Sequence, residues 1–389
     1  MKWINWNRIT KITRKYNDED EENGSNVEKN KELKITQKEI KNKEKSFIES
    51  RLAWKKLFDY PIPKHANDVT YTLGGTIIVL GIVQLITGVI LQQFYIPNSN
   101  SMPGAYESVS EIANNVSLGF VRNLHYWGAQ FLIIMVLLHS ARVFISGAYK
   151  KPREIQWLAG VGLLVTVFAF SYTGTVLKWD QEGTEALEHQ IGTAKIAGPL
   201  GIFLTEQFAP SVSLLSRIFA LHVTAIPAIA VPLLGIHLIL IRLNGIASPK
   251  VLDKYKGITA RVDQKVPFST HINKMLINGA VVTIIVIAFS LIWSAPLYFK
   301  GVEGVEVTKP PWFLLWLYPL ENIFGVPAIA YTTIFVIILF VAVPIVDRKE
   351  VTDPRQRNKM MIAMFLLLLS FVGLMIMGTL SPSMQHNMG

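Results

Sequence analysis

Residues 121–142 read VRNLHYWGAQFLIIMVLLHSAR, an apolar run long enough to cross a lipid bilayer as one helix. Two histidines, His125 and His139, lie in this run with thirteen residues between them. On an α-helix this spacing separates them by roughly 21 Å along the axis but by only about 40° around it. The run therefore predicts a membrane helix that presents both histidines on one face, near opposite leaflets.

A second apolar run, residues 213–243, repeats the pattern with His222 and His237, which have fourteen residues between them. A single histidine in a membrane helix is most often a hydrogen-bonded interior residue or part of a proton relay. Four histidines, paired at nearly one interval on two helices, are typical of axial ligands to haem iron. We expect His125 to pair with His222, and His139 with His237, around two non-covalent b-type haems.

The rest of the chain is also rich in apolar runs. Half of its 389 residues are hydrophobic (50%), and the mean hydropathy is +0.34. Seven runs are long enough to span a hydrocarbon core of about 30 Å, at residues 70–95, 119–146, 156–177, 213–243, 274–298, 325–346 and 359–380. The sequence predicts an all-α polytopic membrane protein, in which a four-helix bundle holds two haems and three further transmembrane helices follow.

Lysine and arginine concentrate in alternate connections, at residues 1–67, 147–154, 244–274 and 347–359. Because basic loops stay in the cytoplasm, seven spans place the N-terminus inside and the C-terminus outside. The net charge of +10 is therefore explained by membrane topology, and no nucleic-acid partner is expected. This orientation assigns His125 and His222 to an outer haem, and His139 and His237 to an inner one.

Composition divides the chain into four parts. Residues 1–50 mix opposite charges densely with few aliphatic side chains, which indicates a charged cytoplasmic tail. We expect a dihaem domain at 51–243, a basic cytoplasmic linker at 244–272, and a C-terminal domain of three spans at 273–389. The tail could also be a docking arm for a partner.

Glycines repeat the histidine interval on two other helices. Gly74 and Gly88 in the first span, and Gly160 and Gly174 in the third, are each separated by thirteen residues. Glycine is frequent at ordinary contacts between membrane helices. The matched spacing favours a second interpretation, in which a porphyrin edge approaches the helix backbone at the two haem heights.

Arginines flank the histidines symmetrically. Arg122 and Arg217 precede the outer pair, and Arg142 and Arg242 follow the inner pair. Arginine binds carboxylates in a fork-like geometry, so the set suits haem propionates or a quinone site. For each residue alone, snorkelling to the lipid headgroups is an equal alternative.

Two long connections are expected on the outer side. Residues 178–212 are interrupted by Gly and Pro and predict short helices lying across the surface. Residues 299–324 are apolar, aromatic and too short to span, which indicates a re-entrant or surface segment. The aromatic side chains of the second connection could line a pocket for an apolar ring, and the carboxylates of the first, Asp180 and Glu185 among them, lie near the expected outer haem.

Several motifs resemble the cytochrome b family of quinol-oxidising bc and b6f complexes. They are RxxH at 122–125, KKPRE at 150–154, LKWDQ at 177–181 and HLILIRLNGI at 237–246. Together with the unequal histidine intervals, they are most similar to cytochrome b6 plus subunit IV, here fused in one chain. The resemblance covers residues 51–380.

The resemblance implies a redox function. Quinol would be oxidised near the outer face, one electron passing to a Rieske iron–sulfur protein and on to a cytochrome c. The other would cross the membrane through the two haems to quinone at an inner site, near Arg242, His65 and Asn67. Such a complex translocates protons, is a homodimer, and lies in the cytoplasmic membrane of a prokaryote.

Two departures from the family pattern stand out. The family has Pro-Glu-Trp-Tyr at its outer site, whereas this chain has Pro310, Pro311, Trp312 and Phe313, without the glutamate that accepts a quinol proton. Glu321, Asp180, Glu185 or water could replace it. Thr72 stands where the b6 type has a cysteine for an extra haem, and the absence of any cysteine excludes covalent haem on this chain. A non-covalent group near Thr72 stays possible.

Two other functions fit the same residues. A dihaem membrane anchor could link another dehydrogenase or reductase to the quinone pool without splitting electron pairs, and Pro311 favours this alternative. A transporter that relays protons through its histidines would need no haem.

Overall fold

A computed structural model of the chain describes residues 59–99, 102–247 and 264–386. The predicted tail at 1–50 and most of the linker at 244–272 lie outside these ranges. Within them, seven helical stretches are long and apolar enough to cross a membrane, as predicted. They are α4 (Val69–Leu91), α6 (Val116–Ile145), α7 (Glu154–Val176), the continuous run Leu214–Asn244, α12 (Phe268–Ile292), α14 (Pro327–Val346) and α15 (Asn358–Leu380).

The predicted bounds agree closely with the observed ones except in the fifth span. The prediction of 274–298 was six residues too late at each end, since α12 covers Phe268–Ile292. The helix begins directly after Pro267, and Trp293 is already extended. Pro296 disfavours helical geometry in the residue before it, so the apolar run continues beyond the helix as a loop.

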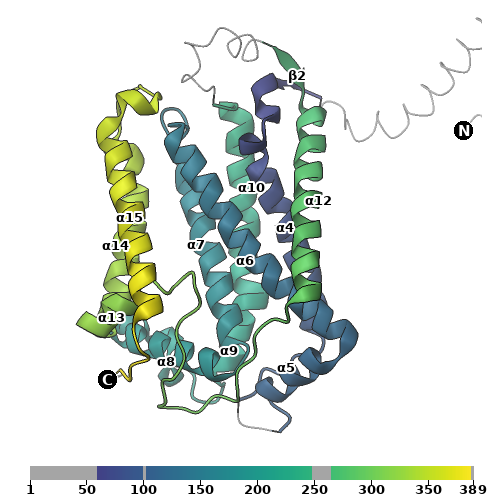
Figure 1. Cartoon of the computed structure of the whole chain (residues 1–389), viewed down its shortest axis with the longest axis vertical. Helices are drawn as coiled ribbons and strands as arrows, with labels where there is room; N and C mark the ends of the chain where they lie inside the picture. Colours follow the sequence, from purple (N-terminus) through teal and green to yellow (C-terminus); the bar gives the residue numbers. More distant parts are fainter. Residues whose placement is uncertain (1–58, 100–101, 248–263, 387–389) are drawn as a thin grey trace, which may run out of the picture. The chain divides into compact units, whose positions relative to one another are not determined.

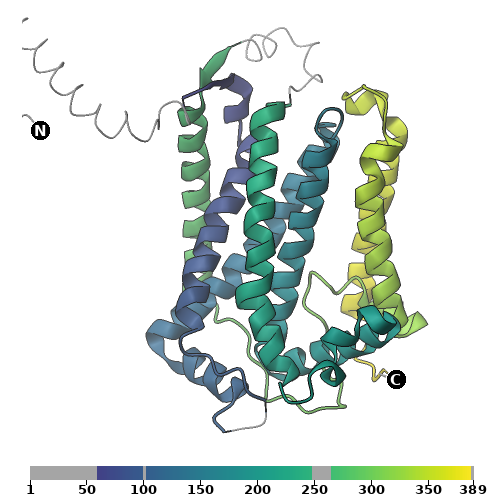
Figure 2. The same ribbon diagram turned by 180° about the vertical axis from the view of Figure 1, so that it is seen from behind.

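The membrane helices pack in two pairs with three further helices around them. Helix α6 packs most extensively against α4, and α10 (Ile226–Asn244) against α7, while α12 covers α4 and α6. Figures 1 and 2 show α14 and α15 beyond α7, on the side away from α12. Most large side chains of α15 are exposed, among them Phe365 (61%) and Leu368 (57%). Such an uncharged surface is suited to contact with lipid.

One end of the bundle, termed the α8 end, is covered by short helices (Figure 1). These are α5 (Ala105–Asn114), α8 (Gln181–Ile196) and α13 (Tyr318–Phe324), with single 3-10 turns at Gly198–Leu200, Ile202–Leu204 and Glu206–Phe208; α9 (Leu214–Ala220) is the first part of the fourth membrane stretch. The short surface helices predicted in 178–212 are thus confirmed. Helix α5 was not predicted, because ten residues with little hydropathy carry no membrane signal.

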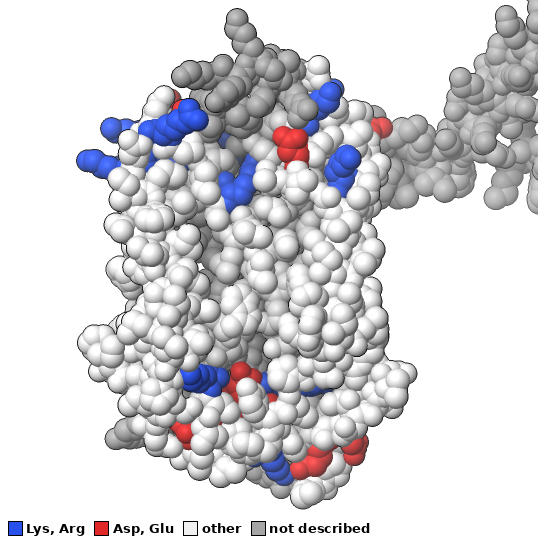
Figure 3. Space-filling model, viewed as in Figure 1, with Lys and Arg blue, Asp and Glu red and all other residues white. Residues whose placement is uncertain are grey.

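The opposite end, termed the basic end, carries most of the lysines and arginines in the view of Figure 3. There strand β1 (Pro61–Pro63) pairs antiparallel with β2 (Lys265–Pro267), with Ile62 opposite Val266. A 3-10 turn, Lys64–Asn67, follows β1 and leads into α4. The pairing joins the entrances of α4 and α12, which are almost 200 residues apart in sequence.

A buried ion-paired network joins the α6–α7 connection to α14 and α15 at the basic end. Asp347 accepts hydrogen bonds from Lys150 Nζ (2.7 Å), the Tyr149 hydroxyl (2.5 Å) and Arg357 Nε (2.9 Å). Burial alone would raise the pKa of Asp347, but these three donors outweigh it and hold the pKa below its usual value. The network therefore fixes the C-terminal helices to the bundle with a charged carboxylate.

Candidate functional site

The structure places the imidazole rings of His125 in α6 and His222 in the fourth membrane stretch next to each other. Their ring centroids are 6.4 Å apart, with the ring planes at 63°. Histidine nitrogens bind first-row metals at about 2 Å. This separation leaves room for one metal atom between the rings and too little for an intervening side chain.

Two threonines that sequence reasoning missed fix the protonation of these rings. Thr87 Oγ1 lies 2.8 Å from His125 Nδ1, and Thr173 Oγ1 lies 2.8 Å from His222 Nδ1. Each hydroxyl already donates its single proton to a backbone carbonyl, at 2.7 Å in both cases. Each threonine must therefore accept from Nδ1–H, which leaves the lone pair of the neutral ring on Nε2.

The threonines follow a pattern that the sequence does contain. Each one directly precedes a glycine that was predicted to lie at haem height, giving Thr-Gly at 87–88 and at 173–174. The repeat of this dipeptide in two helices was a usable signal. It was missed because threonine is an ordinary residue in membrane helices.

At the basic end, His139 of α6 and His237 of α10 are close enough to interact electrostatically. His237 Nδ1 lies 3.0 Å from the Gln156 carbonyl oxygen, so it donates there and Nε2 is again the free nitrogen. His139 Nδ1 is buried and has no hydrogen-bond partner among the described residues. The histidines at this end are thus held without threonine.

The four predicted glycines each lie against one of the four histidine rings. A Cβ atom would stand 3.3 Å from His125 Cε1 at Gly88, from His237 Cε1 at Gly160, and from His222 Cε1 at Gly174. At Gly74 it would stand 3.5 Å from His139 Cε1. Side chains at these places would crowd the imidazoles, so glycine lets α4 and α7 approach the rings.

The unequal histidine intervals are explained by a π-helical turn, η5, at Leu221–Ala225. In a regular α-helix, the fifteen-residue step from His222 to His237 would rotate the second histidine by about +60° around the axis. The fourteen-residue step in α6 rotates it by about −40°, so the two pairs would not line up. A π turn holds one more residue than an α turn and absorbs the difference. Pro227 follows η5 and cannot donate a backbone hydrogen bond, which favours this break in the α-helical ladder.

The arginines near the histidines have different partners at the two ends. Arg122 donates to the carbonyl oxygens of Ala295 (2.9 Å) and Pro296 (2.7 Å). Arg217 donates to the carbonyls of residues 203 and 205, and its Nε is buried without a partner among the described residues.

At the basic end, the Arg142 guanidinium lies 3.5 Å from the centroid of the Tyr71 ring. One of its terminal nitrogens is also buried without a partner among the described residues. The unpaired guanidinium nitrogens of Arg217 and Arg142 could bind a carboxylate such as a haem propionate. Arg242 is exposed at the same end.

Thr72, at the position of the family's haem-linked cysteine, is fully buried. It donates to the Val69 carbonyl (2.8 Å) and accepts from the Asn278 side chain of α12 (2.6 Å). Helix α12 therefore covers this part of α4.

The segment Pro310–Phe313 packs against the α8-end half of the bundle. Trp312 Nε1 donates to Gln130 Oε1 of α6 at 2.6 Å, and the buried Phe313 ring meets Phe168 of α7 edge to face at 6.0 Å. Pro310 and Pro311 are partly buried. Gln130 lies little more than one helical turn from His125, so the segment reaches the neighbourhood of the histidine pair.

Two of the carboxylates predicted near this segment hold loops together. Asp180 caps α8 by accepting from Gly183 N (3.0 Å), and also accepts from Tyr298 N (2.9 Å). Glu185 accepts from the backbone of Val307 (2.8 Å) and from Thr308. Every oxygen of these two carboxylates has a donor.

The third predicted carboxylate, Glu321, has different surroundings. It is buried in α13, and its Oε1 lies 2.8 Å from His189 Nε2. His189, Glu306 and His386 were missed, because their three segments meet only in the folded chain.

Two of the side chains predicted at an inner site, His65 and Asn67, lie at the basic end just before α4. His65 is buried, its Nε2 lies 3.3 Å from the Ala247 carbonyl, and burial lowers its pKa. Asn67 donates to Thr270 at the start of α12. The Arg142–Tyr71 stack lies next to this group, since Tyr71 packs edge to face on His65 at 5.0 Å.

Two family descriptions match the sequence. "Cytochrome b/b6/petB" matches residues 57–245, and "Cytochrome b(C-terminal)/b6/petD" matches residues 303–388. Helix α12 lies between the two matched regions.

Named relatives match about half of the chain over nearly their whole length. Cytochrome b6 of Heliomicrobium gestii is 37% identical over 200 residues, which cover 50% of this chain and 92% of the relative. The menaquinol:cytochrome c reductase cytochrome b subunit of Geobacillus thermodenitrificans is 32% identical over 224 residues, covering 54% and 99%.

A solved structure matches the fold of most of the chain. It is titled "Hyperthermophilic respiratory Complex III", with a TM-score of 0.72, 23% sequence identity, and coverage of 87% of this chain and 91% of that one.

Proposed function

The chain belongs to the cytochrome b/b6 family, and we propose that it is the dihaem cytochrome b subunit of a quinol:cytochrome c oxidoreductase of the bc or b6f type. The observation that carries this proposal is the facing pair His125 and His222, 6.4 Å apart. Each ring donates a hydrogen bond from Nδ1–H to a threonine, which leaves Nε2 as the ligand nitrogen. Haem bound by such nitrogens supplies reversible one-electron transfer.

We propose that His139 and His237 hold a second haem at the basic end. The free Nε2 of His237 and the glycine beside each ring support this assignment. Along α6 the two ligand positions are roughly 21 Å apart. The bundle would thus hold two redox groups in line across the bilayer, with Arg142 and Arg217 offering unpaired nitrogens to propionates.

The charge distribution supports an orientation with the basic end in the cytoplasm. Quinol oxidation would then take place outside, at the α8 end, beside Trp312 and Phe313. Quinone reduction would take place near His65, Asn67 and Arg242, with protons released outside and taken up inside. Electron transfer through this chain would therefore be coupled to proton translocation.

The proton acceptor at the α8 end is proposed to be water. Pro311 removes the family's glutamate, and Asp180 and Glu185 already accept bonds at all of their oxygens. The carboxylate of Glu321 contacts His189 Nε2 at 2.8 Å. Proton transfer can pass through one bound water, so the loss of the carboxyl does not exclude quinol oxidation.

Partners are proposed from the relatives. The name of the Geobacillus protein supports menaquinol as the donor and a cytochrome c as the acceptor for this chain too. A Rieske iron–sulfur protein as the first acceptor, and a homodimeric complex in the cytoplasmic membrane of a prokaryote, follow from the family.

The test is purification of the intact complex from native membranes. We expect a reduced-minus-oxidised b-type spectrum, two haem b per chain, two midpoint potentials, and menaquinol:cytochrome c reductase activity. Co-purification of a Rieske protein completes the expected result. A colourless preparation would refute haem binding and favour the proton-relay transporter.

A second function is favoured by one observation, Pro311 in place of the glutamate. A dihaem anchor that passes electrons between another enzyme and the quinone pool would not need that carboxyl. Two haems with a molybdenum or nickel subunit, and without a Rieske protein, would establish this alternative.

A further inference from the structure

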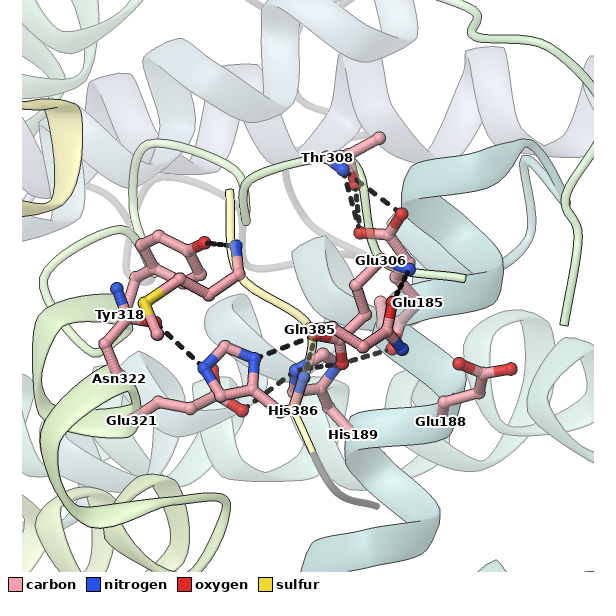
Figure 4. A network of polar contacts seen from close by, with 12 residues as sticks. Glu185, Glu188, His189, Glu306, Thr308, Tyr318, Glu321, Asn322, Gln385 and His386 are labelled. Carbon is pink, nitrogen blue, oxygen red and sulfur yellow. Dashed lines mark hydrogen bonds and ion pairs between the residues drawn. The ribbon is translucent and has the colours of Figure 1, made fainter. Parts of the chain in front are cut away.

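Four side chains, two of them buried and two partly buried, converge at the α8 end from four separate segments (Figure 4). They are His189 of α8, Glu306 of the loop after α12, Glu321 of α13 and His386 near the C-terminus. Glu306 and Glu321 are only 7% and 3% exposed. This group, termed the His189 cluster, has no part in the proposed electron transfer.

His189 presents a lone pair to two carboxylates. Its Nδ1 lies 2.7 Å from the backbone oxygen of Glu185, which can only accept, so Nδ1 carries a proton. Its Nε2 then faces Glu321 Oε1 at 2.8 Å and Glu306 Oε1 at 3.5 Å. Neither oxygen accepts a hydrogen bond from another described residue. In a neutral ring this would bring three acceptors together, so a positive species must lie among them.

His386 has the same difficulty at its two nitrogens. Its Nδ1 lies 2.8 Å from Glu306 Oε2, and its Nε2 lies 2.8 Å from Asn322 Oδ1. A neutral imidazole has one ring proton and cannot donate to both acceptors. If Nε2–H donates to Asn322, Nδ1 is left with a lone pair directed into the cluster.

We propose that the His189 cluster binds one divalent transition-metal cation, with zinc as the best match to its ligands. Ligand atoms of His189, Glu306 and His386 all lie within 4.8 Å of one another, and Glu321 would complete a four-ligand set. Two imidazoles and two carboxylates suit zinc in type and number. Two buried carboxylates and one divalent ion also leave the site without net charge.

The surroundings of the cluster support metal binding. Ligating histidines usually donate their second ring N–H to an oxygen, as His189 does to Glu185 and His386 can to Asn322. The cation would join α8, α13 and the C-terminal segment. Glu306 lies two residues before Thr308, which is hydrogen-bonded to Glu185. A cation bound to Glu306 would therefore also anchor the loop that leads to Pro310–Phe313.

A proton is the competing occupant. Burial alone would lower the pKa of His189, but Glu321 and Glu306 raise it to about 9. Without metal, an imidazolium at His189 would satisfy the same carboxylates. The experiment must therefore distinguish a metal ion from a proton.

Metal content of the purified complex gives the test. The complex is stripped with EDTA, given zinc sulfate and desalted, and zinc is counted by mass spectrometry, separately from the iron of any haem. We expect about one zinc per chain, with X-ray absorption showing imidazole and oxygen ligands near 2.0 Å. His386→Gln and His189→Gln should weaken zinc binding at least tenfold, whereas Glu303→Gln, an exposed acid in the same loop, should not.

Several results would overturn the proposal. Wild-type complex that takes up no zinc, cobalt or manganese would show that a proton fills the cluster. Zinc retained by the His189→Gln, His386→Gln double variant, or bound without imidazole in the wild-type spectrum, would place it elsewhere. If the variants do not assemble, the wild-type complex alone tests the proposal. Imidazole ligands in its X-ray absorption spectrum and a rise of its melting temperature with zinc would support the site, and the absence of both would refute it. Haem content is measured in each sample, so a failure of the proposed haem binding is distinguished from a failure of zinc binding.

Discussion

The two ends of the helical bundle hold their histidines in different ways. At the α8 end, both rings donate Nδ1–H to threonines, at 2.8 Å each. At the basic end, His237 donates to a backbone carbonyl, and His139 Nδ1 is buried without a partner among the described residues. The α8 end is thus fixed from inside, by side-chain hydrogen bonds to the rings.

At the basic end, the helices are instead joined by side chains in the connections outside the bundle core. There the Asp347 network joins the α6–α7 connection to α14 and α15. Hydrogen bonds to a ligand's second nitrogen orient the ring and increase its basicity. The difference therefore predicts that the two proposed haems have unequal potentials, and that only the potential at the α8 end depends on threonine hydroxyls.

The largest effect is expected from removing one histidine at each end. His222→Gln should lose the α8-end haem and His237→Gln the basic-end haem, so that haem content falls by about half in each. Redox titration should show that the two variants retain different midpoints. His271→Gln, another buried histidine, serves as the control with full haem content. Loss of the same midpoint in both variants would contradict the pairing.

Asp347→Asn should destabilise the basic end most. It leaves Lys150 and Arg357 without their buried anion, which typically costs about 3–5 kcal/mol. Thermal unfolding of the detergent-solubilised complex measures the loss, and Asp353→Asn at a partly buried site of the next turn is the control. An unchanged melting temperature would show that the rim does not hold the C-terminal helices.

The pH dependence of the same network follows from the depressed pKa of Asp347. A carboxylate with a lowered folded-state pKa stabilises the fold above its unfolded pKa, near 4, and loses that contribution as the pH falls through the folded value. Acid destabilisation below about pH 4 should therefore be smaller in Asp347→Asn than in the wild type. Parallel acid-unfolding curves would count against a charged Asp347.

Thr87→Val and Thr173→Val should change the α8 end alone. Each removes the threonine acceptor of a buried Nδ1–H, at about 1–3 kcal/mol. A ring that no longer donates is a weaker electron donor to ferric iron, so the potential of that haem should rise while the other stays constant. Thr→Ser at the same positions keeps the hydroxyl and should restore the original value. Equal shifts of both potentials would refute the threonine assignment.

The smallest expected effect distinguishes the glycines. A methyl group at Gly88 would meet His125 Cε1 at 3.3 Å, whereas at Gly74 it would meet His139 Cε1 at 3.5 Å, an ordinary contact. Gly88→Ala should therefore tilt its ring more than Gly74→Ala. The electron paramagnetic resonance signal of low-spin ferric haem reports ring orientation, and a larger change in Gly74→Ala would contradict the geometry.

The sequence by itself determined what repeats along one helix. The seven spans, the histidine intervals and the glycine intervals were all read from the chain, because hydropathy and the α-helical repeat are local properties. The error in the fifth span has the same origin, since hydropathy continued past Ile292 while the backbone turned at Trp293.

The tertiary structure decided which side chains meet. Only the folded chain shows that Thr87 and Thr173 accept hydrogen bonds from the histidines and that η5 absorbs the additional residue. The same holds for the loops that Asp180 and Glu185 hold together. His189 and His386 are almost 200 residues apart, and their approach depends on how α8 and α13 dock at the end of the bundle. Helical periodicity fixes the face on which a residue lies, but only the contacts between helices determine what that face touches.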